Sequence, residues 1–412
     1  MISRRRFLVA SAVLAGAAPM TRMTAAPSTP RFQGTMRLRP GGDDSGYDPW
    51  LEIDADAFRH NASEVSRLAG GRPILAVVKN NAYGLGDTLV GPLLSSCAQV
   101  RGLACVRPAE AIAMRKAGVQ KPILMMSEVG EEEAVDLVAH DVTLTCWFDD
   151  SAARLTRIAK RARKQVKVHL FVDTGLNREG MPYRRAIPWI EDLAGQRAIR
   201  IDGTYHMFVH EVEFDRIQHS RFLEVTAAAR NRGVALGTLH AAPTYELFYL
   251  PESHLDMVRV ANALFGNYPA PDVRDRASLR PVFRLKARVT RVEQLQPGES
   301  AGFHRGPYFV AQRQTWVALL PIGHTDGYPI TAAGTCQVLI NGRLCPVVTG
   351  GVASAHTIID VGPERQVNVG DTATLVGADA REIDPATVAS NAAVPLQQMI
   401  TKFSALLPRR LT

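Results

Sequence analysis

Short apolar runs alternate with helical patterns between Ile74 and Phe265, and this repetition restricts the fold more than any other feature of the chain. A run of four to eight apolar residues between turn signals is typical of a buried strand, and strands that alternate with helices favour a parallel sheet. The eight predicted strands are Ile74–Lys79, Gly102–Val106, Pro122–Met126, Leu144–Phe148, Lys167–Asp173, Asp202–Met207, Thr238–Ala242 and Val258–Phe265. Eight such units over about 200 residues predict a (β/α)8 TIM barrel. A doubly wound sheet is the alternative, but no glycine-rich dinucleotide loop follows the first strand.

Helix ends can be placed between some of these strands. Pro108 is predicted to open one helix, and Gly118 is predicted to close it after a basic last turn. Another helix is expected from about Ser220 to Arg230. These boundaries support the alternation of strands and helices that the barrel requires.

Beyond Pro281 the pattern changes to strand-like runs with few long helices between them. These runs are Phe283–Val292, Trp316–Leu320, Gln337–Ile340 and Thr372–Val376. Asn341-Gly342 after the third run is a signal for a two-residue hairpin. We therefore expect a barrel over residues 48–276, with a first strand at about 49–55 that packs with the C-terminal part, and an all-β domain over residues 277–412.

The N-terminus predicts an export signal. Arg4, Arg5 and Arg6 precede Phe7-Leu8 and a short apolar run, a pattern that resembles the twin-arginine signal of bacteria. The alternative is a basic N-terminus ahead of a core helix. We expect a signal over residues 1–26, a linker rich in Pro, Gly and Ser over residues 27–47, and a periplasmic or otherwise exported protein.

Composition and charge disfavour three kinds of function. The apolar run Leu8–Ala18 is too short to cross a bilayer, so we expect no membrane span after signal removal. Removing the four arginines of residues 1–26 reduces the net charge from +8 to +4. The basic cluster Lys160–Lys164 fits a solvated helix face, so we expect no nucleic-acid partner. The five cysteines lack metal-ligand spacing, so no metal is predicted; Cys336 and Cys345 flank the hairpin without lying opposite, which disfavours a disulfide.

Lys79 ends the first apolar run, where an unpaired charge is costly. At the C-terminal mouth of a barrel strand such a residue is placed for chemistry. Partial desolvation lowers the pKa of an amine, which favours a covalent bond to an aldehyde cofactor. Tyr83, four residues later, can place a hydroxyl on the same side. The alternative is a structural lysine that extends its ammonium group to water.

The segment Ile74–Gly86 resembles the pyridoxal-phosphate lysine motif of the alanine racemase family. The resemblance continues in order through almost the whole chain, over about residues 49–410. The matching segments are Trp50–Ala57, Val172–Gly180, His240–Thr244, Met257–Gly266, Pro321–Gly327 and the end from Ser404 to Arg409. The resemblance implies a TIM barrel with an all-β C-terminal domain, and pyridoxal 5′-phosphate as cofactor.

The resemblance also implies roles for single residues. Lys79 would bind the cofactor covalently and then act as a base at one face of the substrate Cα. The phosphate would be held by the hydroxyls of Tyr83 and Thr244 and by backbone amides near Ala261 and Asn262.

Two arginines complete this half of the implied site. Arg178 would contact the phenolic oxygen of the cofactor and the substrate carboxylate. Arg259 would face the pyridine nitrogen, where a permanent cation weakens the electron sink and favours proton exchange over transamination. Each arginine could instead form an ordinary ion pair.

The half of the site that the family takes from its second domain departs from the pattern. The family's tyrosine base falls at Phe303 or Arg305, and neither side chain can transfer a proton at neutral pH. His304 and Tyr308 are the candidate replacements, unless both are ordinary loop residues. Ser354, where the family has methionine, is a candidate for substrate binding. Further departures are Met207 for the histidine beside the tyrosine, Phe171 for a carbamylated lysine, His324 for an entrance tyrosine and Gln397 for a phosphate-binding tyrosine.

The favoured hypothesis is an exported racemase that interconverts L- and D-alanine, or acts on a broader set of amino acids. A racemase or lyase for another amino acid, and a cofactor-binding protein without turnover, are the alternatives. The resemblance further implies a head-to-tail homodimer in which the second domain completes the partner's active site.

Overall fold

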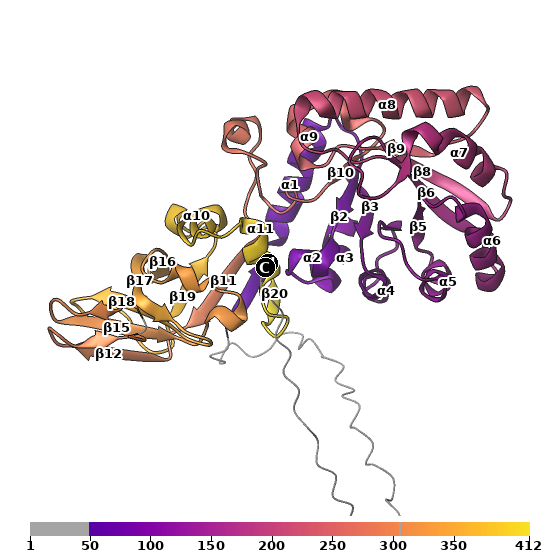
Figure 1. The fold of residues 1–412 in the computed structure, drawn as a ribbon. Helices are drawn as coiled ribbons and strands as arrows, with labels where there is room; N and C mark the ends of the chain where they lie inside the picture. Colours follow the sequence, from indigo (N-terminus) through magenta and orange to yellow (C-terminus); the bar gives the residue numbers. More distant parts are fainter. Residues whose placement is uncertain (1–48, 305) are drawn as a thin grey trace, which may run out of the picture. The chain divides into compact units, whose positions relative to one another are not determined.

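The computed structural model describes residues 49–304 and 306–412, and its first domain is a nearly closed parallel barrel (Figure 1). The strand order is β10-β2-β3-β4-β5-β6-β8-β9. β10 pairs in parallel with β2, and an isolated bridge between His240 and Met257 joins β9 to the start of β10. The predicted TIM barrel is confirmed. Its strands are β2 (Ile74–Val77), β3 (Val100–Cys105), β4 (Ile123–Met125), β5 (Thr143–Cys146), β6 (Val166–Asp173), β8 (Ile199–Tyr205), β9 (Thr238–His240) and β10 (Val258–Val260), with β7 (Met181–Pro182) beside β6.

Helices lie outside these strands, as Figure 1 shows for α4 to α8. They are α1 (Ala55–Leu68), α3 (Asp87–Ser96), α4 (Pro108–Lys116), α5 (Glu131–Ala139), α6 (Ser151–Ala162), α7 (Ala186–Ala194), α8 (Val212–Asn231) and α9 (Thr244–Tyr249). Helix α4 has the predicted bounds. Helix α8 begins well before the predicted Ser220, because the Glu211 side chain accepts the amides of Glu213 and Phe214 and so caps it.

Several barrel strands end before the predicted residue. The first ends at Val77 rather than Lys79, and the last ends at Val260 rather than Phe265. After Val260 the chain turns, and Leu264 donates its amide to the carbonyl of Ala261. The ring of Phe265 packs edge-on against Phe58 at 5.3 Å. The apolar run therefore reflects burial in the core rather than extended backbone.

The C-terminal domain is a sheet in the order β12-β15-β18-β17-β16-β19-β11-β1-β20. Strand β1 (Trp50–Ile53) pairs with β11 and β20, so the first strand of the described chain lies in this sheet. The run predicted as one strand, Phe283–Val292, is broken into β11 (Phe283–Arg288) and β12 (Arg291–Leu295). The other strands are β13 (Ser300–Ala301), β14 (Phe309–Val310), β15 (Thr315–Leu320), β16 (Gln337–Ile340), β17 (Arg343–Val352), β18 (Thr357–Gly362), β19 (Thr372–Val376) and β20 (Arg409–Leu411). Helices α10 (Pro385–Asn391) and α11 (Leu396–Thr401) follow β19.

The predicted hairpin turn is confirmed. Ile340 faces Arg343 across the two strands, with Asn341 at φ 50° and Gly342 at φ 76° between them. Two successive positive φ angles define a turn whose twist matches that of the strands. Cys345 faces Val338 in this ladder. The amide of Val347 donates to Cys336, so the two cysteines are not opposite, and all five cysteines are buried and unpaired.

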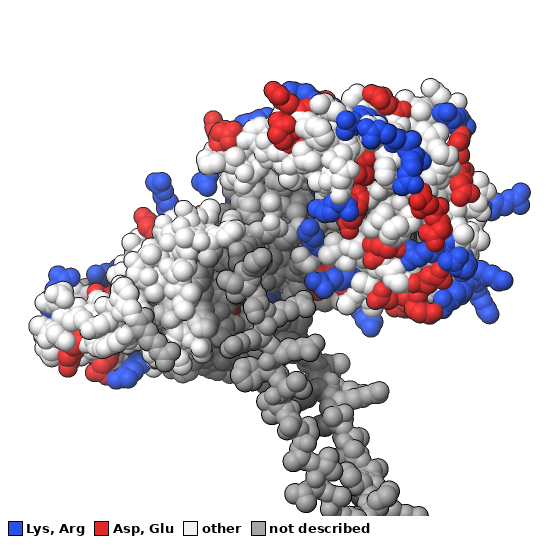
Figure 2. All heavy atoms as spheres, viewed as in Figure 1, with Lys and Arg blue, Asp and Glu red and all other residues white. Residues whose placement is uncertain are grey.

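The surface view in Figure 2 shows basic and acidic side chains intermixed over the barrel helices. Part of this mixing comes from ion pairs between α5 and α6, where Arg161 contacts Glu132 at 2.5 Å and Arg157 contacts Glu131 at 2.5 Å. No helix within residues 49–304 and 306–412 is long and apolar enough to cross a membrane. The export signal and linker predicted for residues 1–47 lie outside the described residues.

Candidate functional site

Lys79 follows strand β2 at the mouth of the barrel and begins an unusual turn, labelled α2 (Lys79–Tyr83). Its next four residues have φ between 49° and 56°, so this segment is left-handed. Left-handed backbone costs about 1–2 kcal/mol for each residue with a Cβ. Strain of this size persists only where neighbouring groups fix the conformation, and it is concentrated at functional sites.

Glu110 is the group that fixes this turn. Its buried carboxylate accepts the amide of Asn81 at 3.1 Å and the amides of Val106 and Arg107 at 3.2 and 3.1 Å. The same side chain therefore caps helix α4 and holds the chain immediately after Lys79. Sequence reasoning missed this role, although a glutamate two residues after a helix-opening proline is a capping signal.

The Lys79 amine lies in a partly buried, cationic environment. Burial is the main cause that lowers its pKa, and the positive charges of Arg178 and Arg259 lower the pKa further. A larger fraction of neutral amine at physiological pH makes Lys79 a better nucleophile and base. The three cations predicted from the sequence are thus close enough to interact.

Arg259 lies on β10 and is almost completely buried. Its guanidinium contacts Nδ1 of His240 at 2.8 Å and donates to the carbonyl of His206 at 3.1 Å, above the Tyr205 ring at 4.8 Å. Burial lowers its pKa to about 10, so it still carries its charge at neutral pH. Two of its five N–H groups are used by these bonds, which leaves donors for a ligand.

The hydrogen bonds of Arg259 fix the protons of two buried histidines. An arginine only donates, so Nδ1 of His240 must accept and its Nε2 must carry the proton. That Nε2 lies 2.8 Å from Nδ1 of His169, which therefore accepts as well. Burial lowers the pKa of His169 to about 4 and that of His240 well below its ordinary value, so both rings are neutral.

Arg178 lies in the loop after β6. Asp173 at the end of that strand accepts the amides of Gly175, Leu176 and Asn177, which holds the loop in place. The Arg178 side chain is largely exposed and contacts the sulfur of Met207 at 3.3 Å and Glu179 at 3.6 Å. Its charge is therefore available to an anionic ligand.

Met207 and His206, which directly follow β8, contact different groups. Met207 contacts Arg178, whereas the His206 ring packs against Phe208 at 4.4 Å and Phe222 at 4.6 Å. His206 is thus turned toward helix α8 and does not take the place of the family's histidine. Phe171 stacks on Tyr205 at 4.5 Å and fills the position of the family's carbamylated lysine with an aromatic ring.

The residues predicted to hold a phosphate lie near one another. Thr244 begins helix α9, and its hydroxyl oxygen accepts the amide of Ala263 at 3.1 Å, which leaves the hydroxyl proton free to donate. Ala261 and Asn262 belong to the same turn after β10. Tyr83 is buried against Phe265 at 5.1 Å, and burial raises the pKa of its hydroxyl, which stays protonated.

These donors fit pyridoxal 5′-phosphate. A lysine with a lowered pKa suits its aldehyde, two hydroxyl donors suit its phosphate, and two arginines suit its remaining oxygen and nitrogen atoms and the substrate carboxylate. Within the described part of the chain, no group of three His, Cys, Asp or Glu side chains is arranged to bind a metal ion.

The second-domain candidates lie together on the C-terminal domain. His304 stacks on Tyr308 with ring centroids 3.8 Å apart, and its Nε2 contacts the Ser300 hydroxyl at 2.9 Å. Both side chains are exposed at the hairpin of β13 and β14. Ser354 is also exposed, and its hydroxyl lies 3.4 Å from Nε2 of His324. His304, Tyr308, Ser354 and His324 have no described hydrogen bond to the barrel residues around Lys79.

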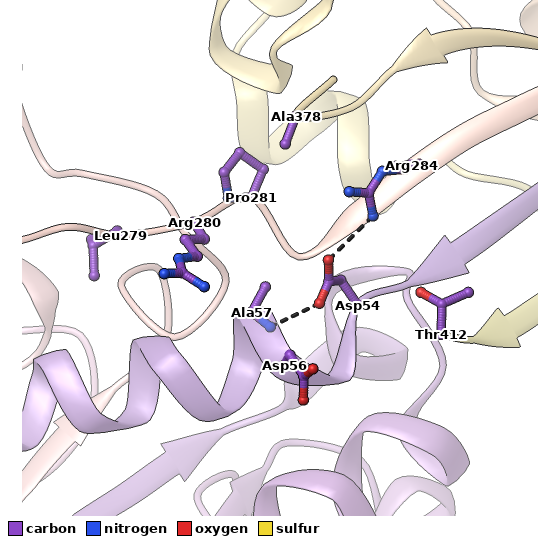
Figure 3. A pocket seen from close by; sticks show the side chains of 9 residues that line it. All are labelled: Asp54, Asp56, Ala57, Leu279, Arg280, Pro281, Arg284, Ala378 and Thr412. Atoms are coloured by element: carbon purple, nitrogen blue, oxygen red, sulfur yellow. Dashed lines mark hydrogen bonds and ion pairs between the residues drawn. The ribbon is translucent and has the colours of Figure 1, made fainter. Parts of the chain in front are cut away.

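A separate pocket of about 490 Å³ lies where helix α1 begins (Figure 3). Asp54 caps α1 through the amide of Ala57 and pairs with Arg284 at 3.2 Å. None of the residues predicted for the active site lines this pocket. Its polar groups are used to join α1 to the C-terminal sheet.

The structure also brings together three titratable residues that sequence reasoning missed. His210 follows β8, Asp215 lies in α8 and Glu246 lies in α9. Nδ1 of His210 contacts Glu246 at 2.8 Å. No local motif links residues this far apart, so the sequence holds no signal for the cluster.

Comparisons with known proteins agree across the chain. Residues 53–269 match the family model for the alanine racemase N-terminal domain, and residues 282–411 match that for the C-terminal domain. An alanine racemase of Desulforamulus reducens is 33% identical over 335 residues, which cover 80% of this chain and 90% of that protein. One of Methanococcus maripaludis is 34% identical over 340 residues, which cover 81% and 90%.

Solved structures give the same result. Alanine racemase of Clostridium difficile 630 superposes with a TM-score of 0.82 at 26% identity, over 89% of this chain and 96% of that one. The enzyme of Streptomyces coelicolor superposes with a TM-score of 0.80 at 26% identity, over 90% and 99%.

Proposed function

The chain belongs to the alanine racemase family, and on this basis we propose that it interconverts L- and D-alanine with pyridoxal 5′-phosphate as cofactor. One observation carries the proposal beyond family membership. Lys79, Arg178 and Arg259 interact electrostatically at one mouth of the barrel, and burial there lowers the pKa of the Lys79 amine.

The chain's own residues would divide the chemistry as follows. Bound pyridoxal phosphate supplies the electron sink that makes the α-proton of an amino acid acidic. Lys79 would bind its aldehyde carbon and later remove or return a proton at one face of the substrate Cα. Arg178 would orient the substrate carboxylate, since its guanidinium is the exposed cation of the site.

Arg259 would limit how strongly the cofactor ring withdraws electrons from the substrate Cα. Its charge is held at the barrel mouth by His240 and the carbonyl of His206. A fixed cation that faces the ring nitrogen keeps that nitrogen unprotonated and limits the depth of the electron sink. Arg259 would in this way favour return of the proton to the α-carbon, and hence racemisation.

Incubation with L-alanine in deuterium oxide tests the proposal. We expect both enantiomers to appear, with deuterium at Cα, and we expect Lys79→Ala to abolish the exchange. A panel of other amino acids, analysed by chiral chromatography, tests the choice of substrate. If another amino acid is racemised and alanine is not, that amino acid is the substrate. A cofactor-loaded protein that exchanges no α-proton of any amino acid would refute the proposed activity.

A homodimer is part of the proposal. His304, Tyr308 and Ser354 are exposed on the C-terminal domain, and Phe303 beside them is 60% exposed. An exposed aromatic group of this kind suits a protein interface. The mass of the particle in solution tests this: we expect twice 44.9 kDa less any removed signal, whereas a monomer would contradict it.

Export is also proposed. The basic and apolar residues 4–15 resemble a twin-arginine signal, which would place the enzyme in the periplasm. Fusion of residues 1–47 to a reporter that is active only after export tests this, with Arg5→Lys and Arg6→Lys as control. Equal export of both fusions would contradict a twin-arginine route.

A further inference from the structure

His210, Glu246 and Asp215 form a cluster of titratable side chains that no assigned role explains. Nδ1 of His210 contacts Oε1 of Glu246 at 2.8 Å. Both carboxyl groups are completely buried, whereas the His210 side chain is 51% exposed. Its Nε2 has no hydrogen bond to any other described residue. The cluster therefore has a buried, acidic end and an imidazole nitrogen that is open to a ligand.

The two buried carboxyl groups interact electrostatically. Oδ2 of Asp215 and Oε2 of Glu246 are buried and receive no N–H or O–H donor from the described residues. Two carboxylates cannot satisfy each other unless one is protonated. Burial and the neighbouring Glu246 raise the pKa of Asp215 from 3.8 to about 7, which favours a proton on Asp215 below neutral pH.

His210 faces this carboxyl pair through Glu246. The hydrogen bond to Glu246 raises the pKa of the His210 ring, which favours its imidazolium form. The other groups that face the ring are Arg178, whose charge opposes protonation, and Tyr245, whose ring lies 5.5 Å away. An imidazole that titrates near neutral pH is suited to donate and accept protons in turn.

The backbone at His210 is held in a costly conformation. Its φ of 65° lies in the left-handed region, which few residues other than glycine and asparagine adopt readily. The preceding amide, that of Val209, donates to Oδ1 of Asp215 at 3.2 Å and to Oε1 of Gln218 at 3.0 Å. Helix α8 thus fixes both the loop and the carboxyl pair behind the ring.

The cluster lies beside the Lys79 site. Glu246 is in the first turn of α9, the helix that begins with Thr244 of the predicted phosphate site. The charge of Arg178 acts on both Lys79 and His210, so this guanidinium lies within electrostatic range of the two groups. Met207, three residues before His210, contacts Arg178 at 3.3 Å, so a substrate whose carboxylate is bound by Arg178 would lie beside the loop that carries His210.

We propose that His210, held by Glu246 and Asp215, is the acid and base at the substrate face opposite Lys79, and that it comes from the same chain as Lys79. This proposal rests on the proposed racemase function and takes the place of the missing tyrosine. In one direction Lys79 accepts the α-proton while the C–H electron pair stays with the substrate, and protonated His210 donates a proton to the other face. Lys79 then carries the added proton and His210 is neutral, which is the starting state for the reverse reaction.

Substitution of His210 tests the role without disturbing the loop. Asparagine tolerates a positive φ and cannot transfer the proton, so His210→Asn should reduce racemisation by about 10²–10⁴-fold. Deuterium exchange at Cα of one enantiomer, catalysed by Lys79 alone, should persist with retention of configuration. His210→Gly keeps the backbone and removes the ring, and added imidazole should restore racemisation in part.

The matched control is His140→Gln, because His140 also pairs with a carboxylate, Asp136, at 3.2 Å, but does so on the outer helix α5. The control should keep its racemase activity. Full racemisation by His210→Asn would overturn the inference while leaving the proposed function intact. If the unsubstituted enzyme shows neither α-proton exchange nor racemisation, the proposed function itself is refuted.

Mixed variants separate a base from the same chain from one supplied by a partner. In a mixture of the Lys79→Ala and His210→Asn variants, every barrel lacks one of the two proton-transfer groups, so no activity should return. If a His304→Ala, Tyr308→Phe double variant is inactive by itself and regains activity when mixed with Lys79→Ala, the partner's hairpin supplies the base, and that result would overturn the inference.

A readout independent of turnover is the titration of the His210 ring by NMR, with its signal assigned by its loss in His210→Asn. Glu246→Gln removes the charge that favours the imidazolium form and should lower the His210 pKa. An unchanged pKa would show that the carboxyl pair does not tune this ring, and would contradict the proposed relay.

Discussion

Glu110 should control both the stability of the barrel and the position of Lys79. Its buried carboxylate joins the left-handed turn after Lys79 to the first turn of α4 through the amides of Asn81, Val106 and Arg107. Glu110→Ala removes all three acceptors and leaves these amides without a protein partner. The strained turn then loses the contact that opposes its relaxation to ordinary backbone.

The expected loss can be worked from these contacts. A hydrogen bond to a charged group contributes about 1.5–3 kcal/mol, and three of them give a simple sum of about 4.5–9 kcal/mol. Bonds to one carboxylate are not independent, and water can reach part of the vacated site, so we expect the lower end, about 4.5 kcal/mol. Glu110→Gln keeps one carbonyl oxygen for Asn81 or for the α4 amides, but not for both, and should cost about half as much.

Urea unfolding of the two variants measures these losses, and the absorbance of reconstituted protein reports how well the Lys79 turn still accepts the cofactor. The matched control is Glu133→Ala, because Glu133 caps α5 through one amide, that of Gly130 at 3.1 Å, and is exposed. This control should lose about 1 kcal/mol and bind cofactor normally. The reasoning is refuted if Glu110→Ala loses no more stability than Glu133→Ala.

Two further predictions concern buried charge. Arg259→Lys should weaken cofactor binding and racemisation by at least about tenfold, because a single ammonium group cannot donate to both His240 and the carbonyl of His206 in the fork geometry of arginine. Titration with the cofactor measures this loss, and an unchanged affinity would contradict the prediction. Asp215 retains a proton in the native state up to about pH 7 that the unfolded chain releases near pH 4, so its contribution to stability is lost as pH rises through this range. Asp215→Asn stays neutral, and its free energy of unfolding should fall less than that of the unsubstituted protein between pH 5 and pH 8; parallel pH profiles would refute the assignment.

Local sequence patterns located the barrel strands because each buried strand requires an apolar run, whatever surrounds it. They placed strand ends less well. Val78 and Phe265 are as apolar as their neighbours because both are buried, yet neither lies in a strand. Hydrophobicity reports burial, whereas a strand end depends on where the backbone turns and which amides it finds, such as the contact of Asn81 with Glu110.

The cofactor half of the candidate site could be named from the sequence, since Lys79, Arg178 and Arg259 each lie in a motif of the family. The second half could not be resolved in this way. The sequence offered His304 and Tyr308, which the structure places in a stacked pair on an exposed hairpin. No sequence motif marks the alternative, His210, which becomes a candidate only because Glu246 and Asp215 lie beside it in the structure.

The sequence by itself thus determined the barrel, the β-rich C-terminal domain and the lysine at the candidate site, because the spacing of apolar residues and short motifs depend only on neighbouring residues. Only the tertiary structure decided which titratable groups lie together and which cations surround the amine. His210 and Glu246 are 36 residues apart in the chain and 2.8 Å apart in space. Electrostatic interaction depends on that second distance, which no local pattern encodes.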